Sequence, residues 1–388
     1  MDLQTPYYVI HKEKLDNNFR LLQRALENHW NNYVIGYSYK TNALPWLIKH
    51  FDSLGCFAET VSEDEYNLAK LIGVAPNRII YNGPIKTKDT FVEALENGCI
   101  VNIDSQREIE WLDNVKMKNR KVGIRINFNI EKLCPGQSQC DNEGGRFGFC
   151  YENGELARAL EKIKSKNAKV SGIHLHTSSK TRSLDIYRAI AEVACAVQIE
   201  FGLKLDYVDI GGGFFGGLPT KPQFDEYIRL MDDILSKCFN KDKTTLIIEP
   251  GMAVVGAPIS YVSTVIDIKD TEFNRFVITD GSRTSIDPLM KKKSYFHLFD
   301  IDGQRETHPK QVICGYTCME HDRIFEEING PSLQLGDQII YDKVGAYTMC
   351  LTPLFIKYFP AVYVDENGKF ELVRKSWTPK EYIMNSYF

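Results

Sequence analysis

Eight short apolar segments, each followed by a stretch with helical periodicity, succeed one another along this 388-residue chain as far as Glu249. Several are continuous apolar runs, as expected for strands buried on both faces. The regular alternation predicts a (β/α)8 TIM-type barrel. A doubly wound open sheet has the same alternation and is the alternative. The predicted strands are residues 33–39, 56–59, 78–81, 99–103, 121–127, 169–175, 205–210 and 245–249.

The segments between these strands carry helix signals. Ser62-Glu63-Asp64-Glu65 reads as a capping box that opens a helix through Leu71. Apolar periodicity predicts further helices over Ile186–Phe201 and Phe224–Cys238. Residues 128–150 break the rhythm. We expect this Gly-, Asn- and Cys-rich insertion, which ends in Arg146-Phe147-Gly148-Phe149, to overhang the strand ends.

The character of the chain changes after residue 254. Strand-like segments then follow one another, separated by turns such as Glu366-Asn367-Gly368, and little helix is evident. We therefore predict a barrel domain over residues 12–254 and a C-terminal all-β domain, sandwich- or barrel-like, over residues 255–388. A short strand at 7–10 within residues 1–11 is expected to join the β domain. The predicted β-domain strands are 261–268, 275–279, 311–314, 338–341, 361–364 and 370–373.

Charge and cysteine content narrow the class of protein. A net charge of −4 gives no reason to expect nucleic acid or a membrane surface as partner. No export signal is evident at the start, and no apolar run approaches the roughly 20 residues of a membrane span. Ten scattered cysteines without a CxxC pair read as reduced thiols in the cytoplasm. Cys134 and Cys140 flank a loop, but no second pair has metal-ligand spacing, so no metal site is expected.

Two residues at the ends of the barrel strands suggest the chemistry. The carboxyl ends of barrel strands line the active site. Lys40 follows the first strand, and Glu249 ends the eighth. A lysine and a carboxylate converging there suggest a Schiff base and a partner for a pyridinium nitrogen. The ordinary alternatives are a solvated lysine and a salt-bridged glutamate.

Other segments add groups that suit a phosphorylated ring. Glycines 211–213 close the seventh strand, where consecutive backbone N–H groups can approach a phosphate, although a tight turn is equally compatible. His176 ends the sixth strand and precedes Ser179, an arrangement that could stack on a ring and bind its phosphate. In the β domain, Cys318 lies in a segment dense in reactive groups, and Tyr347 follows Gly345-Ala346. Both could instead be core or turn residues.

In this order, the segments resemble the fold-type III pyridoxal-phosphate decarboxylases, the family of ornithine and diaminopimelate decarboxylases. The resemblance implies pyridoxal 5'-phosphate as cofactor, an amino acid as substrate, and a homodimer with active sites at the interface. It covers nearly the whole chain. The motifs that carry it are Tyr37–Asn42, Glu59–Ser62, Arg78–Pro84, Arg146–Gly148, His176–Ser179, Asp209–Phe214, Glu249–Gly251, Cys318–Asp322 and Gly345–Thr348.

The resemblance also implies individual roles. Lys40 would hold the cofactor covalently, with Glu59 nearby. His176 would stack on the pyridine face, and Glu249 would pair with its nitrogen. Cys318 would reach the site from the other subunit and protonate the carbanion after carbon dioxide leaves. The remaining residues implied to surround the cofactor or bind its phosphate are Arg125, Ser179, Gly212, Gly213, Gly251 and Tyr347.

Three positions depart from the family pattern. The family has an arginine, which contacts the phosphate, where this chain has Met252. A charged contact of this type is typically worth about 1.5–3 kcal/mol, and Arg283 is one possible replacement. The residue after the catalytic cysteine is an acid in ornithine and diaminopimelate decarboxylases and is Met319 here. Diaminopimelate decarboxylases have an arginine where this chain has Asp287.

These departures bear on the substrate. A site with Met319 and without that arginine suits the doubly charged far end of diaminopimelate poorly, because desolvating unpaired charges costs several kcal/mol. We therefore expect an atypical or conjugated amino acid. Diaminopimelate itself, or ornithine or lysine with its amine received by Asp287 or Glu320, is the alternative. The residues expected to face the substrate are Asp287, Met319, Glu320 and Asp322.

Two other functions share this type of fold. Racemases on a related barrel pair the pyridine nitrogen with an arginine, so Glu249 argues against racemisation. A catalytically inactive regulatory homologue is the alternative from a different class of protein. Such proteins typically lose cofactor contacts, whereas the lysine, histidine, glycines, glutamate and cysteine named above are all present.

Overall fold

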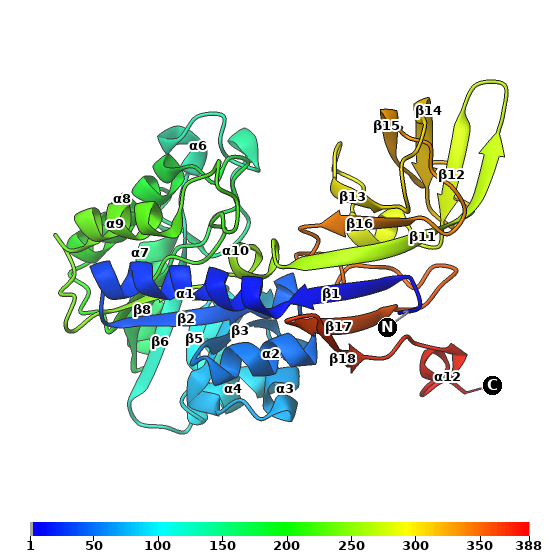
Figure 1. Ribbon diagram of the computed structural model, residues 1–388. Coiled ribbons are helices and arrows are strands. Elements are labelled where there is room, and N and C mark those ends of the chain that lie inside the picture. Colours follow the sequence, from blue (N-terminus) through cyan, green and yellow to red (C-terminus); the bar gives the residue numbers. More distant parts are fainter. Residues whose placement is uncertain (1–2, 388) are drawn as a thin grey trace. The chain divides into compact units, whose positions relative to one another are not determined.

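The computed structural model describes residues 3–387. The chain divides into two compact units. One is Phe19–Ala253, and the other combines the residues up to Asn18 with those from Val254 onward. Figure 1 shows parallel strands and surrounding helices in the first unit and a strand-rich second unit. The described part contains no helix long and apolar enough to cross a membrane.

The first unit is a closed ring of eight parallel strands. Each strand pairs with the next, and the last pairs with the first, with Ile248 opposite Ile35. This closure confirms the predicted barrel and rules out the open sheet. A two-residue strand from the insertion, β7 (Phe149–Cys150), pairs with the carboxyl end of β6. The ring consists of β2 (Tyr33–Ser38), β3 (Phe57–Ser62), β4 (Ile79–Ile85), β5 (Ile100–Ile103), β6 (Arg120–Asn127), β8 (Ala168–His174), β9 (Tyr207–Asp209) and β10 (Thr245–Ile248).

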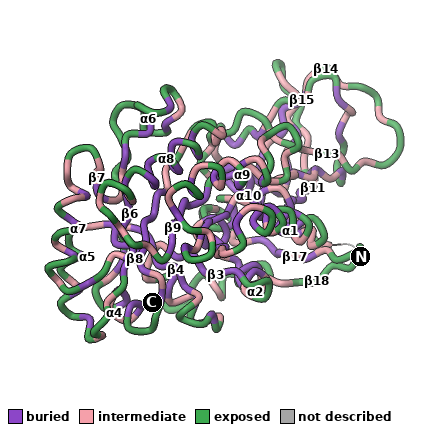
Figure 2. The backbone as a smooth tube through the Cα atoms, turned by 90° about the vertical axis from the view of Figure 1, so that its left-hand side faces the viewer, coloured by how far each residue is buried: buried purple, intermediate pink, exposed green. Residues whose placement is uncertain are grey.

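Helices follow the strands and cover the ring with their apolar faces. In α9 the buried residues recur at helical spacing, from Phe224 through Tyr227, Ile228 and Met231 to Leu235. Figure 2 shows the consequence, with strands such as β6, β8 and β9 largely buried. The helices are α1 (Lys12–His29), α2 (Pro45–Ser53), α3 (Glu63–Ile72), α4 (Lys88–Glu96), α5 (Gln106–Trp111), α6 (Ile130–Leu133), α7 (Glu155–Ser165), α8 (Leu184–Glu200), α9 (Phe224–Leu235) and α10 (Met252–Val255).

The predicted capping box at Ser62 is present in a modified form. The Ser62 side chain accepts a hydrogen bond from the backbone N–H of Glu65 at 3.1 Å. The Glu65 carboxylate returns to the N–H of Val61 at 2.8 Å, one residue earlier than in the standard box. The helix therefore begins directly at the carboxyl end of β3 and fixes the direction in which the chain leaves the barrel mouth.

The second unit is built on a mixed sheet. The long strand β11 (Ile259–Asp270) pairs antiparallel with β1 (Tyr7–His11), β12 and β16, while β1–β17 and β12–β14 pair parallel. Two strands, β13 and β15, were not predicted from the sequence, because charged and exposed residues dilute their apolar pattern. The remaining elements are β12 (Arg275–Thr279), α11 (Arg283–Ile286), β13 (Phe296–Asp300), β14 (Thr307–Cys314), β15 (Arg323–Pro331), β16 (Gln338–Asp342), β17 (Ala361–Glu366), β18 (Lys369–Arg374) and α12 (Pro379–Tyr382).

Candidate active site

Lys40, just after β2, and Glu59, within the neighbouring strand β3, form a close pair. The β2 strand ends at Ser38, and the chain enters a short 3-10 turn (Tyr39–Thr41) that carries Lys40. Ser38 lies opposite Glu59 in the parallel register, so the carboxyl end of β2 is beside Glu59 in β3. Lys40 Nζ lies 2.5 Å from Glu59 Oε2, and Ser38 Oγ donates to the same oxygen at 2.5 Å. A buried carboxylate is thus placed to hold or accept a proton from the lysine.

Asn82 links this pair to the opposite carboxylate. Its side-chain Nδ2 donates to Glu59 Oε1 at 3.1 Å and to Glu249 Oε1 at 2.5 Å. Its Oδ1 accepts from Asn102 Nδ2 at 2.8 Å, and Asn102 Oδ1 accepts from the Tyr207 hydroxyl at 2.7 Å. The result is a buried network that crosses the barrel interior and fixes both carboxylates. Asn82 lies within the motif Arg78–Pro84, but the sequence analysis gave it no role, although it is a polar residue that follows three buried apolar residues in β4.

Glu249 is buried and held in its charged form. Burial alone would raise its pKa, but His174, whose Nε2 lies 3.3 Å from Glu249 Oε2, and more distant Lys40 hold the pKa well below the ordinary range. The pKa of the adjacent Asp209 carboxyl is raised by burial and by the charge of Glu249, so Asp209 stays protonated. A single buried anion at the end of β10 is what a pyridinium nitrogen would require.

His174, Asp209 and Glu249 also offer ligand atoms within 4.8 Å of one another, a spacing that a cation could use. The two carboxylates already accept hydrogen bonds from other groups. Asp209 accepts the backbone N–H of Gly211 at 2.9 Å, and Glu249 is bound to Asn82. His174 was not selected from the sequence as a site residue, because a lone buried histidine gives no signal until its neighbours are known. Asp209 opens the motif Asp209–Phe214, but no site role was assigned to it.

His176 is a neutral imidazole whose position is fixed by backbone contacts. The N–H of Gly212 donates to His176 Nδ1 at 3.3 Å. Burial, together with the charges of Arg125 and Lys40, lowers the pKa of His176 to about 3. The ring therefore carries no charge near neutral pH. A flat, uncharged ring held in this way can stack on a pyridine ring.

Arg125 supports the histidine segment. Its Nη2 donates to the backbone carbonyl of His176 at 3.3 Å, while its Nη1 pairs with Asp104 at 3.1 Å. The Phe147 ring lies 4.7 Å from its guanidinium carbon, and the N–H of Gly148 donates to Asp104. The insertion is therefore anchored beside the strand ends, as the sequence predicted.

The glycines after β9 lie so close to neighbouring atoms, or have such backbone angles, that other residues would not fit there. A Cβ at Gly212 would be 2.0 Å from the carbonyl oxygen of Glu249, and Gly213 has a φ of +92° that strongly favours glycine. A Cβ at Gly251 would be 2.0 Å from Thr41 Oγ1, directly beside Lys40. The backbone thus forms a close-fitting cradle. An amine with a base beside it, a neutral stacking ring, a buried anion and this glycine cradle fit pyridoxal phosphate.

The remaining predicted residues belong to the second unit. Cys318 and Glu320 are exposed there, Met319 is partly buried, and Tyr347 has a φ of +55° and is 37% exposed. Their predicted roles rest on the family resemblance.

Asp322 and Asp287 are already engaged within their own unit. The buried Asp322 carboxylate accepts from Ser282 Oγ, the Arg283 N–H and both the N–H and the hydroxyl of Thr317. Asp287 binds the Arg283 guanidinium at 3.2 Å. These contacts favour roles in shaping loops over the expected roles in substrate contact. They also make Arg283 a poor replacement for the missing phosphate-binding arginine.

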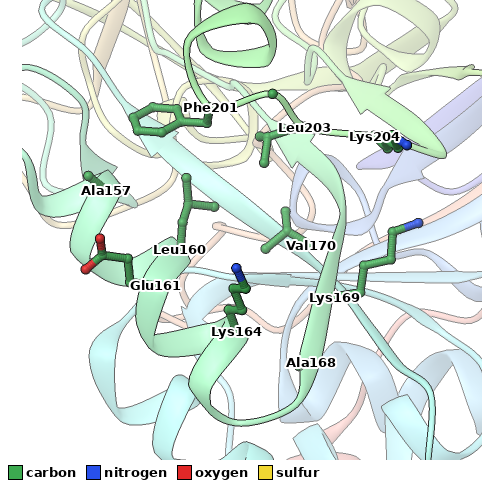
Figure 3. Close-up of a pocket in the computed structure, with 11 residues that line it drawn as sticks. Ala157, Leu160, Glu161, Lys164, Ala168, Lys169, Val170, Phe201, Leu203 and Lys204 are labelled. Carbon is green, nitrogen blue, oxygen red and sulfur yellow. The ribbon is translucent and has the colours of Figure 1, made fainter.

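A separate surface hollow lies in the barrel unit between α7, β8 and the end of α8 (Figure 3). Leu160, Val170, Phe201 and Leu203 line it together with the stems of several lysines. Ala168–Val170 is the amino-terminal start of β8, whereas the residues described above gather at the carboxyl ends of the strands. The hollow is therefore distinct from the candidate active site.

The fold and the site together define the class. The mouth of the closed parallel barrel holds Lys40 beside the buried carboxylate of Glu59, and Glu249 is held ionised. These groups suit an aldehyde cofactor with a pyridine ring. Residues 12–256 match the family model described as "Pyridoxal-dependent decarboxylase, pyridoxal binding domain", and residues 257–345 match its "C-terminal sheet domain". The chain belongs to the pyridoxal-dependent decarboxylases. The predicted family, carboxy-lyase chemistry and pyridoxal 5'-phosphate cofactor are confirmed.

Relatives over nearly the full length carry more specific names. The probable chloroplastic diaminopimelate decarboxylase of Oryza sativa subsp. japonica is 27% identical over 98% of this chain and 79% of its own length. The diaminopimelate decarboxylase of Aquifex aeolicus is 25% identical over 96% of this chain and 89% of its own. A relative of another kind, antizyme inhibitor 2 of Xenopus laevis, is 27% identical over 82% of this chain and 72% of its own length.

Solved structures share the fold. The diaminopimelate decarboxylase of M. jannaschi superposes with a TM-score of 0.88 at 22% identity, covering 100% of this chain and 93% of that one. The arginine decarboxylase of Paramecium bursaria Chlorella virus superposes with a TM-score of 0.78 at 23% identity, covering 94% and 96%. At this identity the likeness establishes the fold alone.

Proposed function

We propose that this enzyme decarboxylates diaminopimelate at one Cα and releases lysine. The observation that carries the decarboxylase chemistry is the buried network in which Asn82 joins Glu59, the partner of Lys40, to the ionised Glu249. The substrate is supported by several relatives named diaminopimelate decarboxylase, and solved structures of such enzymes hold L-lysine. The expectation of an atypical or conjugated amino acid has no support among these relatives, and diaminopimelate replaces it.

The residues divide the work as follows. Pyridoxal phosphate, when bound, supplies an electron sink for the carbon that loses carbon dioxide. Glu59 Oε2, at 2.5 Å, can take a proton from Lys40 Nζ and leave a nucleophilic amine. Glu249 presents a charged carboxylate toward the barrel interior, where its low pKa keeps it ionised. The neutral ring of His176 would stack on the cofactor ring, and Arg125 holds the backbone carbonyl of His176 by a hydrogen bond.

Residues of the second unit are also given roles in the proposed reaction. We assign Cys318 as the proton donor to the carbon that has lost its carboxylate, acting from the partner subunit of a cytoplasmic homodimer. Tyr347 contributes to phosphate binding. Both side chains are exposed in the single chain, as residues that serve a neighbouring subunit would be. We assign Met319, the next residue in the sequence, to the contact with the far end of the substrate, as the resemblance implies.

A release assay for carbon dioxide tests the proposal. The purified enzyme with pyridoxal phosphate is incubated with diaminopimelate, lysine, ornithine or arginine, and products are identified by mass spectrometry. We expect release from diaminopimelate with formation of lysine. Lys40→Ala abolishes it, whereas Lys49→Ala, an exposed lysine on α2, does not. Cys318→Ala keeps the bound-cofactor absorbance but loses most turnover.

Each alternative has its own result in this assay. Release from ornithine, lysine or arginine but not from diaminopimelate would refute the substrate and keep the reaction class. Interconversion of stereoisomers without carbon dioxide would indicate a racemase. Failure to bind the cofactor at all would favour a regulatory homologue.

A further inference from the structure

The resemblance implies an arginine that contacts the cofactor phosphate at the position of Met252. In this structure the side chain of another arginine, Arg182, lies against Met252. Arg182 Nη1 is 2.7 Å from Met252 Sδ. The two residues are 70 positions apart in the sequence, and Arg182 comes from the segment between β8 and α8. The fold therefore brings the Arg182 guanidinium next to position 252, where the resemblance implies an arginine that this chain lacks.

The surroundings hold Arg182 firmly. Its backbone N–H donates to Ser179 Oγ at 2.9 Å, and its carbonyl accepts from the Tyr227 hydroxyl at 2.6 Å. Its φ of +52° lies in the left-handed region, which costs a non-glycine residue energy and needs such support. The guanidinium carbon lies 5.2 Å from the centre of the Phe215 ring, two residues after the glycine segment. Arg182 is thus fixed between the serine and the glycines assigned to the phosphate.

The guanidinium itself has no strong acceptor. A thioether sulfur is a weak hydrogen-bond acceptor, and an aromatic face offers only a cation–π contact. Among residues 3–387, no carboxylate forms an ion pair with Arg182, in contrast to Arg125 and Arg283, which pair with Asp104 and Asp287. A partly buried guanidinium with five donors and no anion nearby is suited to bind one.

We propose that Arg182 binds the phosphate of pyridoxal phosphate in place of the arginine absent at position 252. The charge has moved from the segment after β10 to the segment after β8, and the methionine side chain takes the space that the family's arginine would fill. The inference rests on the proposed phosphate-binding role of Ser179 and Gly213.

Cofactor titration separates the phosphate from the ring. Wild type, Arg182→Gln, and Arg188→Gln as a control on an exposed arginine of α8 are freed of cofactor. Each is titrated with pyridoxal phosphate and with pyridoxal, which lacks the phosphate. We expect Arg182→Gln to raise Kd for pyridoxal phosphate roughly 10- to 100-fold, the range for a lost charge-assisted contact. The Kd for pyridoxal should stay unchanged, and Arg188→Gln should behave as wild type.

A charge exchange gives a second readout. The double variant Arg182→Met with Met252→Arg should recover most of the affinity that Arg182→Met loses, because it restores the family arrangement. If Arg182→Gln weakened the binding of pyridoxal phosphate and of pyridoxal equally, or weakened neither, the inference would be overturned. The proposed function would stand in that case, as long as the wild type binds pyridoxal phosphate. Absence of binding by wild type would overturn both. Circular dichroism of each variant identifies a loss of folding.

Discussion

Gly212 offers a sharp test of the barrel-mouth geometry, because the structure leaves no space for even one methyl group there. An added Cβ would lie 2.0 Å from the carbonyl oxygen of Glu249, whereas carbon and oxygen in contact are normally about 3.3–3.6 Å apart. Gly212→Ala must therefore push the segments after β9 and β10 apart by more than about 1 Å. The same movement displaces the carboxylate assigned to the cofactor.

The cost can be estimated from the contacts that resist this movement. The two segments are joined by the hydrogen bond from Glu249 N–H to the Gly211 carbonyl at 2.8 Å, and Asn82 holds the Glu249 side chain at 2.5 Å. Overpacking a rigid interior typically costs about 1–3 kcal/mol, and a weakened hydrogen bond adds about 0.5–1.5 kcal/mol. A loss of about 3 kcal/mol corresponds to a Tm decrease of roughly 6–12 °C for a unit of this size.

Thermal unfolding and cofactor titration measure the two effects. Gly145→Ala is a matched control, because the Cβ there would meet its nearest atoms at 3.7 Å, an ordinary contact, and the residue has no positive φ. We expect Gly145→Ala to change stability by no more than about 0.5 kcal/mol, and Gly212→Ala to lower both Tm and cofactor affinity. Wild-type values for Gly212→Ala, or an equal loss for both variants, would refute the geometric argument.

Two further predictions concern the buried polar groups. Asn82→Leu removes the amide that donates to Glu59 and Glu249. Because a hydrogen bond to a charged group contributes about 1.5–3 kcal/mol, the loss of both should lower the unfolding free energy by about 3 kcal/mol or more. An unchanged denaturant midpoint would contradict this prediction. The pKa of His176 is about 3 in the folded state, compared with an ordinary value of 6.5. Between these two pH values the unfolded chain therefore binds more protons than the folded chain. The unfolding free energy consequently falls as the pH decreases through this range. The difference in unfolding free energy between the cofactor-free wild type and His176→Gln should change by about 2 kcal/mol between pH 7.5 and 5, because each pH unit below 6.5 contributes about 1.36 kcal/mol. A difference that does not depend on pH would count against a partly buried, neutral histidine.

The local sequence determined the barrel and the location of its chemistry. Continuous apolar runs form strands because both faces are buried, and residues that directly follow them, such as Lys40 and Glu249, must gather at one end of the ring. These statements need only the strand ends and the parallel topology. The strands β13 and β15 were missed for the same reason, because their partly exposed faces carry no continuous apolar signal.

Only the tertiary structure decided which groups meet across the barrel. Asn82 bridges two carboxylates on different strands, and the pKa of Asp209 is raised by burial and by the charge of Glu249, 40 residues away in the sequence. Asp322 and Asp287 look like free acids in the sequence, yet their oxygens are taken up by backbone and side-chain donors nearby. Arg182 meets Met252 for the same physical reason: contacts and desolvation depend on distance in space, which sequence separation does not encode.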